Sequence, residues 1–114
     1  MDAGLLVLSR YPMVTAENCL FKRSAHSDRV AAKGVLYVKL ELGTQSLHLF
    51  NTHMQAFYSR HDEQAIAVKA AQTRELAAFV TQLTKDDREP VLMCGDFNIN
   101  SRPDPKGDGS ELVE

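Results

Sequence analysis

An acid and an amide directly follow a short apolar run near the end of the sequence. Val91–Cys94 is typical of a buried strand, and Gly95, Asp96, Phe97 and Asn98 come straight after it. Catalytic groups collect at the carboxyl ends of strands, where a rigid sheet presents a loop, and Gly95 would let the backbone turn or approach another group closely. Asp96 and Asn98 are two residues apart, so in extended geometry their side chains point the same way. A carboxylate beside an amide oxygen suits Mg²⁺ or an oriented attacking water, whereas the alternative is an Asx turn, and the pattern alone favours neither.

A histidine occupies a similar place in the middle of the chain. His53 lies just past the apolar run 46–51, where an imidazole can donate a proton or stabilise charge on a phosphate oxygen. The alternative is a surface histidine held by a backbone carbonyl. His48 alternates with Phe50, which predicts a packed side chain, and no close Cys/His pair has the spacing of a zinc site. If the two strands are neighbours, their ends share one rim, and the acid, the amide and His53 form a site for metal-assisted hydrolysis of a phosphoester.

The elements between these residues are predicted from hydrophobic periodicity. Residues 35–42 alternate, which predicts a strand with an apolar face and a solvated face that carries Tyr37. The turn signal Gly43-Thr44 joins this strand to 46–51 as an antiparallel hairpin. Helical periodicity runs from 62 to 83, where Ala is frequent and Gly and Pro are absent. Its expected buried stripe consists of Ile66, Ala70, Thr73, Leu76, Val80 and Leu83.

The rest of the chain completes an α/β pattern. Gly4–Ser9 is apolar on both faces and predicts a strand buried on both sides, and residues 14–21 predict a further strand. Residues 23–33 predict a loop. The order of elements indicates a mixed, mostly antiparallel sheet with one covering helix. Because one helix covers only one sheet face, we interpret residues 1–100 as the central part of a larger domain and residues 101–114 as a loose C-terminal tail.

Length and charge narrow the function classes. The chain has 114 residues, a net charge of −2 and 44% hydrophobic residues, which suits one small globular unit. A protein that grips many phosphates of a nucleic acid carries a basic excess, so no stable nucleic-acid binding is expected. No apolar run is long enough for a transmembrane segment, and the first residues lack the pattern of a signal peptide. Cys19 and Cys94 are too few for a disulfide framework, and we expect free, buried thiols.

Five segments together resemble the endonuclease/exonuclease/phosphatase superfamily, the DNase I-like group, and most closely its bacterial-type neutral sphingomyelinase (sphingomyelinase C) branch. The resemblance covers about residues 4–100 and rests on residues 4–12, on Asp28–Val35, on Asn51–Ala56 (Asn-Thr-His-Met-Gln-Ala), on Val68–Gln72 with Lys69 where Arg is usual, and on Gly95–Asn98. It implies a partial DNase I-like sandwich and a Mg²⁺-dependent phosphodiesterase. Its expected substrate is the phospholipid sphingomyelin, which water attack would split into ceramide and phosphocholine.

The resemblance also implies residue roles. Asp96 would orient or deprotonate the attacking water, Asn98 would bind the phosphate, and His53 would stabilise charge on the phosphorane or leaving oxygen. Asp96 and Asn98 would be weak Mg²⁺ ligands, because the family's metal-binding Glu and terminal Asp-His pair have no counterpart in this sequence. We therefore expect little or no activity from the chain by itself. The alternatives are a nuclease or inositol-phosphate phosphatase of the same superfamily, or a non-catalytic remnant that acts as a binding module. Sphingomyelinases of this branch are often secreted, and an exposed sheet face would favour self-association.

Overall fold

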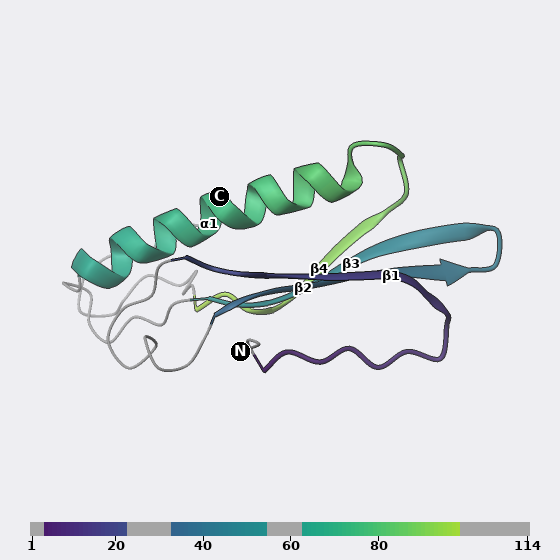
Figure 1. The fold of residues 1–114 in the computed structure, drawn as a ribbon, viewed down its shortest axis with the longest axis horizontal. Coiled ribbons are helices and arrows are strands. Elements are labelled where there is room, and N and C mark those ends of the chain that lie inside the picture. The colour runs from purple at the N-terminus through teal and green to yellow at the C-terminus, as the bar shows by residue number, and fades with distance from the viewer. Residues whose placement is uncertain (1–3, 23–32, 55–62, 99–114) are drawn as a thin grey trace, which may run out of the picture.

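The chain forms a four-stranded mixed sheet with one long helix against one of its faces (Figure 1). The structure is a computed structural model that describes residues 4–22, 33–54 and 63–98. Its elements, in order, are β1 (Met13–Leu20), β2 (Gly34–Leu42), β3 (Gln45–His53), α1 (Glu63–Thr84) and β4 (Val91–Asp96). The sheet order is β1-β2-β3-β4, with antiparallel pairs β1/β2 and β2/β3 and a parallel pair β3/β4. The predicted α/β class with a mixed, mostly antiparallel sheet and a covering helix is confirmed.

The β2–β3 hairpin follows from its two-residue turn. Gly43 has a φ of 69°, in the left-handed region that glycine adopts without strain. From this turn the register runs without a shift from Leu42 opposite Gln45 to Gly34 opposite His53. The strand β3 is longer than the predicted 46–51, since Thr52 and His53 still belong to it. The hairpin therefore delivers His53 at a strand end.

The helix α1 returns the chain to the edge of the sheet, where β4 pairs in parallel with β3. Parallel neighbours need a long crossover connection, and α1 provides it. In the register of this pair His53 lies opposite Asp96. The two strand ends that carry the predicted site residues are thus neighbours on one rim of the sheet, which is the condition that the predicted site required.

The core lies between α1 and the sheet. Its buried cluster includes Tyr37 and Phe50, whose ring centroids are 4.8 Å apart, and Phe79 of α1 meets the Phe50 ring edge-on at 6.1 Å. The prediction of a solvated Tyr37 face was therefore wrong, because Tyr37 is only 2% exposed. The apolar body of tyrosine packs under the helix, while its hydroxyl reaches a partner, His48, 2.8 Å away.

The buried stripe of α1 differs from the predicted one at its N-terminal half. Ile66, Ala70 and Thr73 are exposed, whereas Lys69 and Gln72 are buried. Hydrophobicity alone assigns lysine and glutamine to the solvent side of a helix. Here the helix turns these long polar side chains inward, and Lys69 reaches the end of the sheet that carries Asp96 and Asn98. Ala65, Val68 and Leu76 complete the buried face.

Two predicted strands are less buried than expected. Residues 4–9 form no strand but an extended segment on the sheet face opposite α1 (Figure 1), with Leu6 70% and Leu8 85% exposed. The Asn51 side chain of β3 holds this segment to the sheet by donating a hydrogen bond to the Leu6 carbonyl, 3.2 Å long. The strand β4 forms as predicted, yet Val91–Met93 are each more than two-fifths exposed. Among the described residues no strand pairs with the far side of β4, so its apolar side chains have few neighbours.

The two thiols are free, as expected, but Cys94 is exposed rather than buried. They lie on β1 and β4 with two strands between them, about 14 Å apart at ordinary strand spacing, too far for a disulfide. Burial, and then the nearby Glu75 carboxylate, raise the pKa of the Cys19 thiol, which keeps it protonated at neutral pH. The predicted loop within 23–32 and the predicted tail at 101–114 lie outside the described residues. No helix among those residues is long and apolar enough to cross a membrane.

Candidate active site

The structure brings together all three residues predicted for the site. Nε2 of His53 lies 3.9 Å from Oδ2 of Asp96, and the two side chains are 38% and 64% exposed. The imidazole and the carboxylate therefore share one rim of the sheet and face solvent, where a substrate can reach both. Neighbouring strand ends hold the pair, since the backbone amide of Met54 also donates to the carbonyl of Asp96 at 3.0 Å.

Asn98 lies on this rim in a turn rather than in extended backbone. Its backbone N–H donates to Oδ1 of Asp96 at 2.9 Å, which is the contact of the Asx turn that the sequence left as the alternative, and its φ is 53°. The backbone therefore leaves, at Asn98, the extended geometry in which the side chains of Asp96 and Asn98 would point the same way. The Asn98 side chain instead donates to the Met54 carbonyl at 2.7 Å. The amide oxygen and the second N–H of this side chain have no hydrogen-bond partner among the described residues and are the atoms that can meet a ligand.

Two lysines that received no role from the sequence lie beside these residues. Nζ of Lys33 is 3.4 Å from both ring nitrogens of His53, and Lys33 is only 7% exposed. Lys69, reaching in from α1, donates to the Asn98 carbonyl. The signal for Lys33 was present in the hairpin, because counting back from the turn places Gly34 opposite His53. The signal for Lys69 was not, since only the packing of α1 on the sheet decides which way that lysine turns.

Gly95 allows β4 to approach β3 closely at the base of the site. Its φ is 129°, and a Cβ at this position would lie 2.8 Å from the backbone nitrogen of Thr52 and still closer to the Thr52 oxygen. The side chain of Thr52 is buried and donates to the Gly34 carbonyl at 2.8 Å. The expectation that Gly95 permits a close approach is confirmed, and the contact sets Asp96 one residue beyond it beside His53.

The arrangement is suited to a phosphoryl group. Two ammonium groups share this rim with the Asp96 carboxylate, that of Lys33 against the His53 ring and that of Lys69 against the Asn98 carbonyl. Cationic groups fixed by a rigid sheet stabilise charge that develops on phosphoryl oxygens. The carboxylate beside them can accept a proton or orient a water molecule.

The fit to Mg²⁺ is partial. Asp96 presents an exposed carboxylate, and oxygen donors of this kind are what Mg²⁺ prefers. Within the part of the chain that the structure describes, however, no three acidic, histidine or cysteine side chains gather as a metal site would require. The described residues could supply one or two ligands of a Mg²⁺ site, not the whole of it.

His48 lies away from this rim and is a packed side chain, as predicted. It is 1% exposed and is bonded to Tyr37 and Asp87 at the opposite end of β3.

No protein-family model matches the chain, but individual proteins do. A sphingomyelinase of Dictyostelium discoideum is 32% identical over 98% of this chain, which spans 31% of that protein. Sphingomyelinase C of Listeria ivanovii is 29% identical over 98% of this chain, which spans 34% of it. The chain therefore spans about a third of the length of these curated relatives.

Solved structures agree with the sequence relatives. Sphingomyelinase C from Streptomyces griseocarneus superposes with a TM-score of 0.77 at 28% identity, over 94% of this chain and 37% of that one. Beta toxin from Staphylococcus aureus, in a crystal structure with bound magnesium ions, superposes with a TM-score of 0.75 at 29% identity, over 88% of this chain and 35% of that one. The sheet and helix described above are thus part of the DNase I-like fold of these proteins, and the resemblance inferred from the motifs is confirmed.

Proposed function

We propose, from the homology of this chain to the sphingomyelinase C proteins, that it carries part of the active site of a phosphodiesterase that hydrolyses sphingomyelin to ceramide and phosphocholine. The observation that supports this most directly is the pairing of His53 with Asp96 at the ends of two neighbouring strands, beside Lys33 and Lys69. These residues offer the base, the charge and the phosphate contacts that hydrolysis of a phosphodiester needs.

Each residue has a role that its surroundings support. The exposed carboxylate of Asp96 orients the attacking water and can take its proton, because its own orientation is fixed by the Asn98 amide. His53 faces the same solvent region and stabilises the charge that develops on phosphoryl or leaving oxygens. The free N–H of the Asn98 side chain is available to a phosphate oxygen, while its other contact anchors the turn to Met54.

Mg²⁺ is the cofactor that we propose for this reaction, with Asp96 as a ligand and Asn98 as a second oxygen donor. When bound, the ion would neutralise charge on the phosphoryl oxygens. The steps assigned to His53, Asp96 and Asn98 above depend on their own positions on the rim.

A chimera tests the proposal because the chain aligns with about a third of a solved enzyme. This chain would replace the matching segment of the Streptomyces griseocarneus sphingomyelinase C, and phosphocholine release from sphingomyelin vesicles would be measured with Mg²⁺ and after its chelation. We expect Mg²⁺-dependent release by the chimera and little or none by the 114-residue chain. His53→Ala and Asp96→Asn should each lower kcat of the chimera by about 100- to 1000-fold, the usual effect of losing one such group.

Arg74→Ala, which removes an exposed cation of α1 that has no role in the proposed site, is the matched control and should leave kcat unchanged. The proposal fails if the folded chimera is active and both rim variants hydrolyse sphingomyelin as fast as the control.

A further inference from the structure

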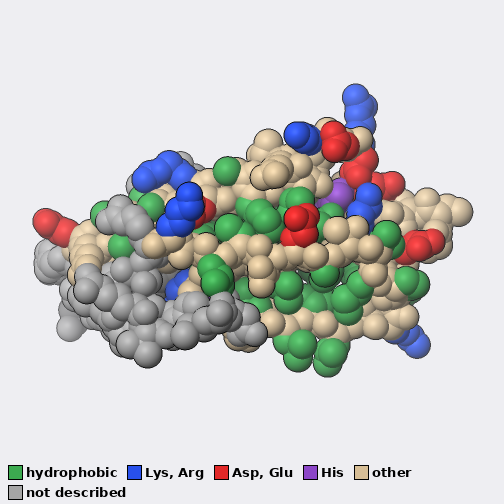
Figure 2. Space-filling model, viewed as in Figure 1, with side chains coloured by type: hydrophobic (Ala, Val, Ile, Leu, Met, Phe, Trp, Pro, Cys, Tyr) green, Lys and Arg blue, Asp and Glu red, His purple; other side chains and the backbone are tan. Residues whose placement is uncertain are grey.

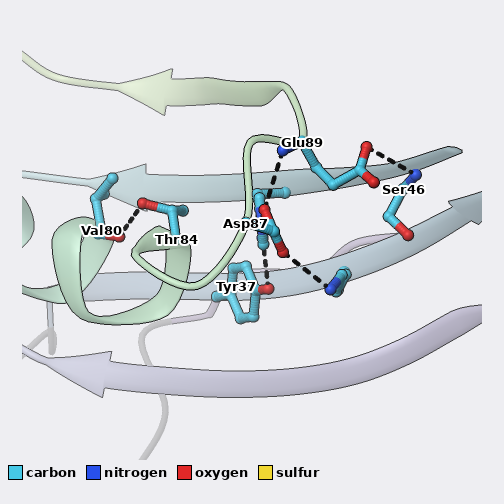
Figure 3. A network of polar contacts seen from close by, with 8 residues as sticks. Tyr37, Ser46, Val80, Thr84, Asp87 and Glu89 are labelled. Atoms are coloured by element: carbon cyan, nitrogen blue, oxygen red, sulfur yellow. Dashed lines mark hydrogen bonds and ion pairs between the residues drawn. The ribbon is translucent and has the colours of Figure 1, made fainter.

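A buried histidine, His48 of β3, lies beside the connection 85–90 between α1 and β4, five residues from His53 along the strand. Figure 3 shows its two partners, Tyr37 and Asp87, within this network of polar contacts. The Tyr37 hydroxyl is 2.8 Å from Nδ1 of His48, and Oδ1 of Asp87 is 2.8 Å from Nε2. An ionised carboxylate can only accept, so Nε2 carries a proton that it donates to Asp87, and a neutral ring accepts from Tyr37 at Nδ1. Both ring nitrogens are thereby satisfied, one from β2 and one from the connection 85–90.

The same connection is tied to the sheet at several more points. Figure 2 shows acidic and basic side chains gathered with a histidine over this end of the molecule. The charged groups around the histidine are Asp87 and Glu89 of the connection, Lys39 of β2 and, near Tyr37, Glu17 of β1. The further bonds are Lys39 Nζ to Asp87 Oδ2 (3.2 Å), Glu89 N to Asp87 Oδ1 (3.0 Å), Ser46 N to Glu89 Oε2 (3.3 Å) and His48 N to the Pro90 carbonyl (2.9 Å).

Packing contributes little to the placement of β4 within the described part of the chain. Its apolar side chains at 91–93 are about half exposed, and β3 is its partner. A strand without a buried face has a weakly specified register, and a slip by one residue turns every side chain to the other face. Such a slip would carry Asp96 away from His53. The ties at the start of β4, where Val91 lies opposite His48, therefore bear on the register.

We propose that the Tyr37–His48–Asp87 chain is a positioning device: it fixes the start of β4 against β3 and so, together with the close contact of Gly95 with Thr52, sets the register that holds Asp96 beside His53, five residues and about 16 Å further along the strands. Asp87 is the residue that closes it, because its carboxylate accepts from His48, from Lys39 and from the Glu89 amide together. This proposal is about the register of β4 against β3, so it would hold even if the phosphodiester chemistry proposed above were wrong.

NMR of the full 114-residue chain tests this with Asp87→Ala and Asp87→Asn. In the unsubstituted chain we expect a slowly exchanging Nε2–H signal from His48 and cross-strand contacts between His53 and Asp96. Asp87→Ala should abolish the Nε2–H signal, weaken the His53–Asp96 contacts and speed hydrogen exchange of the β4 amides at least about tenfold more than that of the β1–β2 amides. Asp87→Asn retains an acceptor oxygen and should restore part of the protection.

Asp86→Ala is the matched control, because this neighbouring acid is exposed and makes no hydrogen bond or ion pair within the described part of the chain. Asp86→Ala should leave the His48 Nε2–H signal, the His53–Asp96 contacts and the hydrogen exchange of the β4 amides unchanged. If Asp87→Ala unfolds the chain, the test relies on Asp87→Asn. A loss of hydrogen-exchange protection in Asp87→Asn that is confined to the β4 amides supports the positioning device. Equal acceleration in all strands, or unchanged His53–Asp96 contacts in a folded Asp87 variant, would overturn it.

Discussion

At the scale of single residues, close packing and burial fix the geometry of the candidate site. Asp96 faces His53 because β4 approaches β3 closely one residue earlier, where Gly95 lies against Thr52. Lys33 and Lys69 add positive charge, yet both are almost buried, so their ammonium groups are held rather than mobile. A substitution at such a closely packed position can therefore disturb the site even when it removes no functional group.

Gly95→Ala should therefore destabilise the protein strongly. A Cβ would overlap the Thr52 backbone, and a φ of 129° is strained for any residue with a side chain, so we expect a loss of about 3 kcal/mol or more in the free energy of unfolding. Urea denaturation followed by circular dichroism measures this.

Gly43→Ala is the control for Gly95→Ala. It has positive φ as well, but nothing lies within 4 Å of the new Cβ, so a loss of only about 1–2 kcal/mol is expected from the backbone conformation. Equal losses in the two variants would show that the close contact with Thr52 is not tight.

Asp87 predicts a pH dependence of stability. The hydrogen bond from His48, followed by the bond from the Glu89 amide, lowers the pKa of Asp87 from 3.8 to about 2. A depressed pKa in the folded state stabilises the fold above the unfolded value of the pKa, and this contribution is lost as the pH falls from about 4 to about 2. The urea midpoint of the unsubstituted chain should therefore fall more over this range than that of Asp87→Asn.

Asp86→Asn should follow the unsubstituted chain over the same range, since Asp86 is exposed and has no hydrogen-bond or ion-pair partner among the residues that the structure describes. Parallel curves for the unsubstituted chain and Asp87→Asn between pH 4 and 2 would contradict the assignment.

At the scale of the elements, the features that local sequence signals determine were predicted correctly, and those that long-range packing determines were not. The hairpin could be predicted, because alternation and a Gly-Thr turn fix both strands and their register within about 20 residues. The helix was also predicted nearly to its ends, but not the face it buries. Lys69 and Gln72 are buried only because α1 lies over the rim of the sheet, and hydrophobicity cannot reveal this.

Burial of whole strands was the least predictable property. An apolar run such as 4–9 or 91–94 shows what a segment could bury, while its actual burial depends on which neighbours are present. In the described part of the chain neither segment has elements on both sides, so both are more exposed than predicted.

At the scale of the whole molecule, exposed apolar side chains remain on the extended segment 4–9, where Figure 2 shows them along the lower side of the view, and on β4. Burial of such surface is favourable, so we predict concentration-dependent self-association of the chain. A double variant, Leu6→Ser with Leu8→Ser, should shift the association toward monomer in sedimentation equilibrium. Ile66→Ser, which changes one exposed apolar side chain on α1 instead, is the comparison.

An unchanged association constant in the Leu6/Leu8 variant would place the contact elsewhere on the surface.

The amino-acid sequence by itself determined the class of fold, the hairpin, the helix and the three polar residues at strand ends, because each depends on turn chemistry, periodicity or spacing within a short segment. Only the tertiary structure decided that β3 and β4 are parallel neighbours with His53 opposite Asp96, and that two lysines join them. The crossover through α1 joins residues 43 positions apart in the sequence, and no local pattern encodes the distance between such segments.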